Sequence, residues 1–289
     1  MGTKAWGASA PIALIALASL LPLAASAAPP ASPFSAEATI DWTAGTLSVD
    51  VELDLAAAGI RLPSGRSQAE RAMEEAVPDL IRETALGIAL DSYRSVDDSI
   101  KDGTLEPNAF EAFLDGGRRV QSALSRDLSR LEASYEWRLA DLAALYVRHS
   151  VPMDLPVPDR YAPTKDYTGI VVYLRGRFDV RGEHRQDSLR PCLFPRLYDD
   201  EMNAIIERNL LYPDALRERG AVGYAVGLDD PVIASRAGDS PLRVIASAIF
   251  GSNRTDAVIS ADDALKILGS PANRELARQG KVVFVIDEP

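Results

Sequence analysis

Residues 256–286 read DAVISADDALKILGSPANRELARQGKVVFVI and contain the clearest fold signal in the chain. Short apolar runs at 256–259 and 281–286 are typical of strands. The second run is apolar at successive positions, so it predicts a central strand that is covered on both faces. This end of the chain therefore predicts helices packed on a buried sheet.

Two helices are expected between those strands. Ser260 is a good N-terminal cap for a helix over 261–268. Ser270, as cap, and Pro271, in first place, open the second helix, and Gly280 ends it. The order is therefore strand, helix, helix, strand.

Working backwards, three apolar stretches predict further strands, at 167–174, 220–226 and 242–249, and residues 189–198 form a second extended segment. Residues 199–208 fit either a helix or a further strand, because periodicity alone does not separate the two. Together with the end of the chain, these elements predict a C-terminal α+β domain over 166–289.

A proline-rich passage precedes that domain. Residues 151–163 hold four prolines in thirteen residues, which sustains neither a helix nor a sheet ladder. We interpret residues 151–165 as a linker.

Period-two alternation marks the region before the linker. Segments 38–42 and 46–55 predict a β-hairpin with one wet face, and segments 118–125 and 130–139 predict two more strands. The region 36–150 is expected to be an α+β domain of the form ββ-α-ββ, an antiparallel or mixed sheet packed by one or two helices.

The helix of this first domain carries its own start signal. Ser67 and Glu70 have the spacing of a capping box. Pro78 is expected to kink the helix or to restart it as a second helix reaching about Leu90. A short helical stretch is expected near 108–114.

The N-terminus predicts export. One lysine, Lys4, precedes the apolar run 11–23, and the small residues Ala25-Ser26-Ala27 follow it, as in a secretory signal peptide over 1–27. Residues 28–35 are then a flexible lead. A spanning helix needs about 20 apolar residues, and Pro22 interrupts this run. The expected location is the periplasm, and a lipoprotein is not expected because no cysteine stands at the cleavage point.

Composition narrows the class of protein. The chain has 289 residues, 31 Lys and Arg against 42 Asp and Glu, a formal charge of -11, and 47% hydrophobic residues. An ordinary globular protein is indicated, and an acidic chain argues against nucleic acid as a partner. The single cysteine, Cys192, lies among apolar neighbours and is interpreted as a small buried hydrophobe.

The residues do not form a catalytic or metal-binding signature. The two histidines, His149 and His184, have no second histidine or cysteine at metal-ligand spacing, and no G-x-S-x-G elbow or phosphate-binding glycine loop is present. We expect no catalytic residue, no metal and no cofactor. We interpret the acid pairs as helix caps and turns; they are Asp97-Asp98, Asp199-Asp200-Glu201, Asp229-Asp230 and Asp262-Asp263.

One segment stands out by charge. Residues 165–196 contain seven Lys and Arg against four Asp and Glu in an otherwise acidic chain. A solvated hairpin arm is one interpretation and a partner-binding surface is the other. The candidate residues of this basic arm are Arg175, Arg177, Arg181, His184 and Arg185.

A family resemblance rests on four segments: YTGIVV (167–172), LRPCLFPRLYDD (189–200), NRTDAVIS (253–260) with Asp262-Asp-Ala264, and GKVVFV (280–285). They resemble a largely uncharacterised family of exported proteins of spirochaetes and other Gram-negative bacteria. The helix with Ala69, Ala72 and Ala76 is similar to the domain shared by small outer-membrane lipoproteins and the flagellar T-ring protein. The resemblance implies protein contacts in the cell envelope, including those around the flagellar motor, and no reaction.

A second resemblance concerns Asp256. The sequence Thr255-Asp256, a strand and a helix after Ser260 resembles the peptidoglycan-binding domain of OmpA-like proteins, which uses an aspartate and a helix arginine. Here the helix has Lys266 but no arginine. The first hypothesis is a non-enzymatic periplasmic structural or assembly protein; peptidoglycan binding and a cryptic periplasmic hydrolase remain the alternatives.

Overall fold

Alternating apolar residues build the first sheet. The computed structural model describes residues 32–160 and 163–288, and the expected signal peptide lies outside them. The first sheet is antiparallel in the order β1-β2-β4-β3. Its strands are β1 (Phe34–Asp41), β2 (Thr46–Asp54), β3 (Arg118–Leu124) and β4 (Arg130–Arg138).

The flexible lead was expected to continue to Ser35, but β1 already begins at Phe34. Phe34 pairs with Leu53, and the pairing continues without interruption to Asp41 and Thr46 around the turn. Strand β2 therefore pairs with more of the preceding chain than the sequence of 28–35 indicated.

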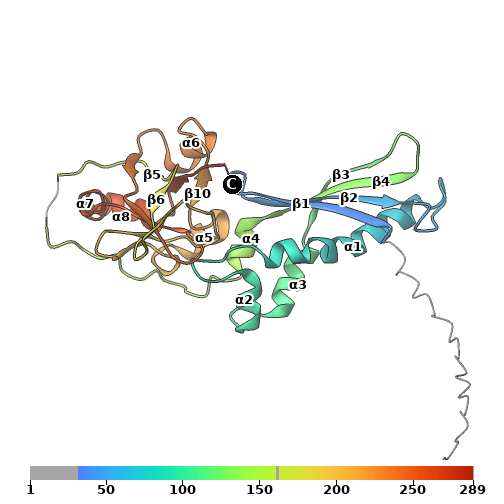
Figure 1. The fold of residues 1–289 in the computed structure, drawn as a ribbon, viewed down its shortest axis with the longest axis horizontal. Helices are drawn as coiled ribbons and strands as arrows, with labels where there is room; N and C mark the ends of the chain where they lie inside the picture. The colour runs from blue at the N-terminus through green and yellow to red at the C-terminus, as the bar shows by residue number, and fades with distance from the viewer. Residues whose placement is uncertain (1–31, 161–162, 289) are drawn as a thin grey trace, which may run out of the picture. The chain divides into compact units, whose positions relative to one another are not determined.

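One helix packs against this sheet. Helix α1 (Arg66–Leu86) buries Ala69, Met73, Val77, Ile81 and Ala85 at helical spacing, and Figure 1 shows it running along the sheet. This stripe is the reason that the helix forms, because its apolar face meets the sheet at β2 and β1.

Two details of α1 differ from the prediction. The helix begins after Gly65, with no side-chain cap, so the expected capping box of Ser67 and Glu70 is wrong: Ser67 is already helical and Glu70 instead pairs with Arg66 at 3.1 Å. Of the two alternatives for Pro78, the restart is wrong, because the helix runs through it, and the kink stays a prediction. Buried Val77 and Ile81 hold the neighbouring turns on the sheet and offset the cost, about 3 kcal/mol, of an interior proline.

Short helices complete the first part. Helix α3 (Pro107–Asp115) lies where a helical stretch was expected, whereas α2 (Val96–Lys101) was missed within a polar segment. Strand β4 ends at Arg138 and α4 (Leu139–Ala144) follows directly, so the predicted strand was one residue too long and the helix was missed.

The second part is built on a wholly parallel sheet in the order β10-β14-β5-β11. An all-parallel sheet was not expected, since the prediction was of antiparallel or mixed sheets. The predicted central position of β14 is confirmed, because all four of its residues are buried. The strands are β5 (Ile170–Tyr173), β10 (Gly223–Ala225), β11 (Leu242–Ile245) and β14 (Val282–Val285).

A mixed sheet and a small hairpin lie beside it. The mixed sheet has the order β12-β13-β8-β9, and β6 pairs with β7. The strands are β6 (Phe178–Asp179), β7 (Gln186–Asp187), β8 (Leu197–Tyr198), β9 (Ala204–Ile206), β12 (Ala248–Phe250) and β13 (Asp256–Val258).

The mixed sheet corrects two expectations. The single strand predicted over 242–249 is divided into β11 and β12, which belong to different sheets. The open choice for 199–208 is decided for a strand at β9, followed by a 3-10 turn (Arg208–Leu210). Pairing partners, and not periodicity within either segment, make both decisions: β11 pairs with β5, which is far away in the chain, and β9 pairs with the nearby β8.

The terminal helices are found where they were predicted. Helix α7 (Ala261–Leu268) is capped by Ser260, whose Oγ accepts from the Asp263 N–H at 3.2 Å, and α8 (Pro271–Arg278) packs on it. The Ser270 side chain does not cap α8; it donates to Asp166 at 3.0 Å. Two more helices with proline in first place, α5 (Pro213–Arg219) and α6 (Pro231–Ala237), were missed.

The predicted class, α+β with two parts, is confirmed. Helices and sheets segregate in the first part, and the second combines the parallel and mixed sheets with four helices. The described residues between α4 and β5 are in neither a helix nor a strand. One continuous apolar core contains side chains of both parts, for example Leu90 and Phe194.

Candidate functional site

A short segment between α1 and α2 joins the first part to the second. Leu193 N donates to Ala89 O at 3.0 Å, and Phe194 N donates to Leu90 O at 2.9 Å. Asn253 N donates to Ser92 O at 2.9 Å, while its side-chain amide donates to Asp91 O at 3.0 Å. Backbone groups that would otherwise be unpaired are thus satisfied across the junction, as buried polar groups require.

Three polar side chains are buried at this junction: Ser92, Thr255 and Asp256 are at most 1% exposed. Ser92 Oγ lies 3.2 Å from Thr255 Oγ1, and Asp256 Oδ1 accepts from Arg196 N at 3.0 Å. Asp256 Oδ2 has no hydrogen-bond partner among the described residues. Burial raises the pKa of Asp256 above its usual value, although its hydrogen bonds oppose the shift.

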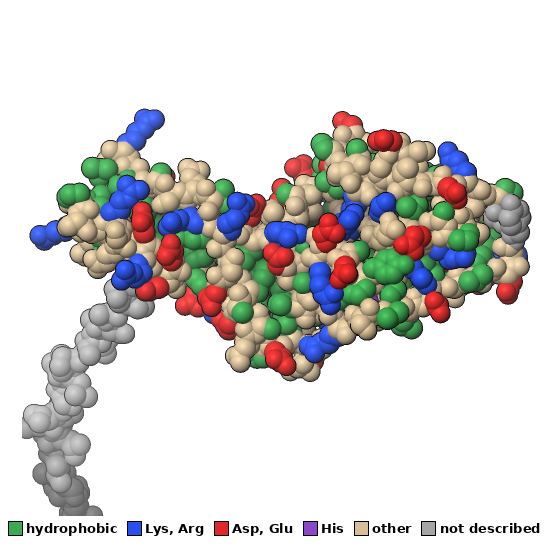
Figure 2. Space-filling view, turned by 180° about the vertical axis from the view of Figure 1, so that it is seen from behind, with side chains coloured by type: hydrophobic (Ala, Val, Ile, Leu, Met, Phe, Trp, Pro, Cys, Tyr) green, Lys and Arg blue, Asp and Glu red, His purple; other side chains and the backbone are tan. Residues whose placement is uncertain are grey.

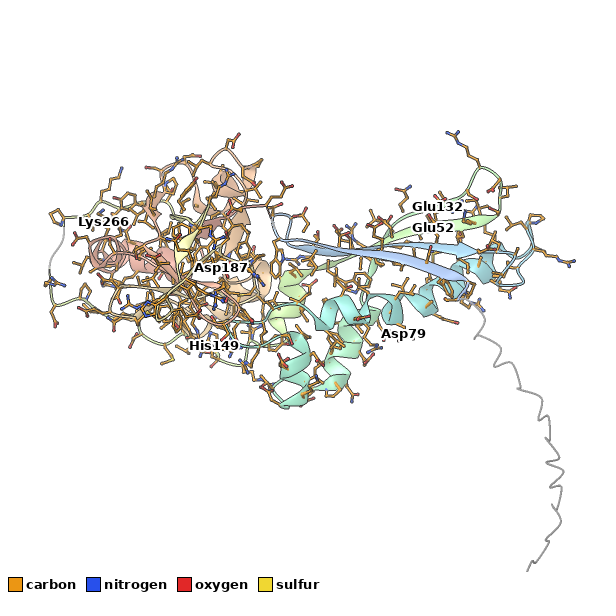
Figure 3. The ribbon with its side chains drawn as sticks, viewed as in Figure 1. Glu52, Asp79, Glu132, His149, Asp187 and Lys266 are labelled. Carbon is orange, nitrogen blue, oxygen red and sulfur yellow. The ribbon has the colours of Figure 1, made fainter. Side chains whose placement is uncertain are left out.

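Asp256 is therefore placed differently from a surface ligand for peptidoglycan. Its carboxyl group is fully buried on β13, and Lys266, on the following helix, pairs with Asp263 at 2.7 Å (Figure 3). Asp256, on which the OmpA-like resemblance depended, is thus engaged in the core, and Lys266 pairs within its own helix.

Cys192 and Tyr224 form a second buried contact beside this cluster. Tyr224 OH donates to Cys192 O at 2.9 Å and accepts from Cys192 N at 3.0 Å. Burial raises the pKa of the Cys192 thiol and of the Tyr224 phenol, which keeps both neutral. The prediction of a buried cysteine is confirmed.

A pocket of about 520 Å³ opens next to Tyr224, between the β1–β2 turn, α4, α5 and α6. Three arginines and one carboxylate line it: Arg138, Arg219, Arg236 and Glu218. The half-buried Trp42 lies at its wall, with its ring 5.6 Å from the Tyr224 ring in an edge-on arrangement. The pocket is therefore positively charged, although the whole chain has a formal charge of -11.

Arg236 is held in the pocket wall by carbonyl groups. Its Nε donates to Gly280 O at 2.8 Å, and its Nη1 and Nη2 donate to Arg219 O and Gly220 O at 2.6 and 2.8 Å. Two of these carbonyls belong to the C-terminal end of α5, where helix carbonyls lack partners. Burial and the nearby Arg219 charge lower the pKa of Arg236 to about 9.

No local sequence signal marks this pocket. Its charged residues come from three separated elements, β4, α5 and α6, and in the sequence each looks like an ordinary surface residue. The proline that opens α6 and the glycine that ends it could have indicated that helix, but nothing local indicates that Arg236 points at α5.

The five residues of the basic arm lie on or beside the β6–β7 hairpin and are all exposed. Arg177 donates to Gln186 O at 2.6 Å, Arg181 donates to Asp200 O, and Arg175 lies 3.6 Å from Asp287. Arg185 pairs with Glu183 at 3.0 Å. The arm therefore exists as a hairpin, and part of its charge is neutralised locally.

Arg254, which was not among the predicted site residues, anchors this hairpin. The Arg254 side chain is 6% exposed and pairs with Glu183 at 2.9 Å and with Asp187 at 3.6 Å (Asp187 is labelled in Figure 3). Arg254 also adopts a positive φ of 59°. Glu183 of the arm thus bridges the buried Arg254 and the exposed Arg185. Figure 2 shows the same interspersion of acidic and basic side chains over the face drawn there.

The interpretation of the acid pairs as caps and turns is confirmed. Asp98 completes a capping box with Ser95, Asp230 caps α6, and Asp263 accepts from Ser260. Asp199 accepts from the backbone N–H groups of Glu201 and Asn203 in a turn. These carboxylates therefore stabilise local structure.

The two histidines lie apart in the structure. His149 Nε2 is 2.9 Å from Leu211 O, and its Nδ1 is buried without a hydrogen-bond partner among the described residues (Figure 3). His184 is exposed in the basic arm. Within 32–160 and 163–288, no three His, Cys, Asp or Glu side chains are placed to hold a metal ion. No helix in those ranges is long and apolar enough to cross a membrane.

Comparisons with known proteins match both parts. Residues 33–145 match the family model described as Treponema pallidum Tp0624, N-terminal domain, and residues 169–288 match the model described as Treponema pallidum Tp0624, second domain. The chain is similar to the first two domains of that spirochaete protein. The two matches follow each other in the same order and support a spirochaete-type family of uncharacterised function. A search of curated proteins found no match.

Proposed function

We propose that the protein is a non-enzymatic structural or assembly protein that is exported to the periplasm and acts through protein contacts in the cell envelope. The family similarity supports membership of a spirochaete-type family of uncharacterised function. A flagellum-associated role, close to the motor, is the finer form of this proposal. The N-terminal sequence supports export.

The observation that carries the proposal is the anchored basic arm. A two-stranded hairpin is marginally stable in water on its own. Here buried Arg254 fixes it through Glu183 and Asp187, while the arm's basic residues remain exposed. A cationic surface that is held in one place, in an acidic protein, is suited to an acidic protein surface.

The side chains that could carry chemistry make structural contacts instead, and this supports the same proposal. Asp256, Cys192 and Tyr224 are buried in the junction, and His149 contacts the Leu211 carbonyl. These groups contribute to the contact between the two parts, which fixes the surfaces that a partner would meet.

The experiment is crosslinking and co-purification of the tagged, full-length protein from the envelope fraction of the native cell. A triple variant, Arg177→Gln, Arg181→Gln and Arg185→Gln, removes three charges from the arm. The matched control removes three exposed arginines elsewhere: Arg71→Gln, Arg126→Gln and Arg217→Gln. We expect one defined set of envelope proteins that is lost with the arm variant and retained with the control.

Two results would overturn the proposal: a cytoplasmic location, or a partner set that both variants retain or both lose. Sedimentation with purified peptidoglycan tests the first alternative, since binding that Asp256→Asn abolishes while the fold is retained would favour it. Turnover in a hydrolase panel that is abolished by His149→Ala or His184→Ala would favour the second.

A further inference from the structure

The pocket beside Tyr224 has the features of a ligand site that the proposed function does not use. Its volume, about 520 Å³, is within the range of small-molecule sites, about 300–1,000 Å³. It is formed by elements of both parts, as ligand sites at junctions commonly are. Its walls combine buried apolar residues, such as Leu139 and Leu193, with a few polar groups.

The charges of the pocket are not balanced by the protein itself. Arg138, Arg219 and Arg236 face one carboxylate, that of Glu218. The Glu218–Arg219 pair, at 3.4 Å, is largely exposed, and pairs of this kind contribute little. Arg138 lies 3.5 Å from Asp141 and also donates to the Glu218 carbonyl. Two carboxylates, those of Glu218 and Asp141, therefore accompany three arginines, and one positive charge remains in the pocket wall.

Helix capping explains only part of the arrangement. Arg236 uses three N–H groups on carbonyl oxygens, and a guanidinium has five. Two N–H groups remain beyond that capping role. Carbonyl dipoles also do not neutralise a buried cation as a carboxylate would. The lowered pKa of Arg236 reflects this and would rise again with an anion beside it.

We propose that the pocket between Trp42 and Arg236 binds a small organic anion, with one phosphate or carboxylate group and an attached apolar portion. Guanidinium groups recognise both anions through paired, charge-assisted hydrogen bonds. Arg219 and Arg138 line the pocket with partly exposed side chains that can receive the charged group, and Arg236 completes the positive wall. The exposed part of the Trp42 ring provides an apolar surface for the remainder of the ligand.

Isothermal titration calorimetry of the purified full chain tests the proposal with three probes. Phenyl phosphate and benzoate carry the two anionic groups, and benzyl alcohol is the neutral analogue. We expect saturable binding of at least one anion with a Kd of about 1 mM or tighter, and at least tenfold weaker binding of benzyl alcohol. The stronger of the two anions then identifies the charged group.

Matched variants locate the binding. Arg219→Gln and Arg138→Gln should each weaken anion binding about tenfold. Arg217→Gln, on the same helix as Arg219 and paired outside the pocket with Asp214, should leave the Kd unchanged. Circular dichroism and Tm without ligand confirm that each variant is folded. The proposal is overturned if neither anion binds, if benzyl alcohol binds as tightly, or if Arg217→Gln weakens binding as much as Arg219→Gln.

Discussion

The Ser92 and Thr255 hydroxyl oxygens lie 3.2 Å apart in a fully buried contact, although 163 positions separate the two residues in the chain. Around them, Ala89, Leu90 and Ser92 accept backbone hydrogen bonds from the second part. This junction makes the two parts share one core, because opening it would exchange buried hydrogen bonds for bonds to water and would expose the apolar side chains packed around them.

A substitution at Gly251 tests how tightly that junction is packed. Gly251 has a φ of +92°, and a Cβ at this position would lie 2.5 Å from Ser92 Cβ. We expect Gly251→Ala to lower the free energy of unfolding by about 3 kcal/mol, from backbone strain together with displacement of Ser92. Urea unfolding measures the effect.

Gly176→Ala is the matched control. Gly176 has a φ of +96°, but a Cβ there meets no atom within 4 Å. The Gly176→Ala variant should lose only the strain contribution to the free energy of unfolding, about 1 kcal/mol. Equal losses in the two variants would show that the contact with Ser92 has no steric consequence.

Asp256 should make stability depend on pH. Burial raises its pKa, so the folded protein holds the carboxyl proton more tightly than the unfolded chain does. The contribution of Asp256 to the free energy of unfolding is therefore most favourable at low pH. It declines as pH rises from the unfolded value, near 3.8, through the raised folded value.

Asp256→Asn removes this dependence. Asn keeps an acceptor for the Arg196 N–H and carries no charge, so we expect it to stabilise the protein by about 1 kcal/mol at pH 7 and by less at pH 4. Unfolding curves at the two pH values measure the difference. A stabilisation that is larger at pH 4 would contradict the assignment of a raised pKa.

Cys192 should resist alkylation in the folded protein. Cys192 is 1% exposed, and burial raises the pKa of its thiol, so the reactive thiolate is scarce. We expect no labelling by iodoacetamide at pH 8 over a period that labels the urea-unfolded chain completely. Mass spectrometry of the intact protein measures this, and rapid labelling of the folded protein would show that the junction opens.

Arg236 should contribute to stability as well as to the pocket. Arg236→Gln removes donors from the Arg219, Gly220 and Gly280 carbonyls, so we expect a loss of about 3 kcal/mol in the free energy of unfolding. Arg217→Gln breaks an exposed pair at 3.1 Å and should change it by less than about 0.5 kcal/mol. Similar Tm values for the two variants would contradict the capping role.

Glu52 and Glu132 stand directly opposite each other on β2 and β4, on the open face of the first sheet (Figure 3). Like charges in this position destabilise a sheet. Glu132→Gln should therefore raise the free energy of unfolding by about 0.5 kcal/mol at low salt. The gain should shrink in about 1 M NaCl, where the Debye length is about 3 Å; a gain that is independent of salt would have another cause.

Local sequence patterns predicted the elements whose partners are near in the chain. The hairpin of β1 and β2, the helix α1 and the terminal order of β13, α7, α8 and β14 all follow from periodicity, caps and turn residues. The errors at Ser67 and Ser270 have a common reason: a serine caps a helix only where its backbone geometry and its competing partners allow, and Ser270 donates to Asp166 instead.

The candidate sites also differ in how far apart their residues lie in the chain. The basic arm could be located from its charge because its residues are neighbours in sequence. The Arg254 anchor and the arginine pocket could not, since Arg254 lies far along the chain from Glu183, and Arg138, Arg219 and Arg236 meet only after folding.

The sequence by itself determined the α+β class, the strand and helix order at the C-terminus and the burial of Cys192, because each depends on the apolar pattern of one short segment. Only the tertiary structure decided the parallel sheet, the junction through Ser92, Thr255 and Asp256, and the positive pocket. Each of these depends on pairings between residues far apart in the chain, and such pairings are set by the packing of the whole core and not by local preference.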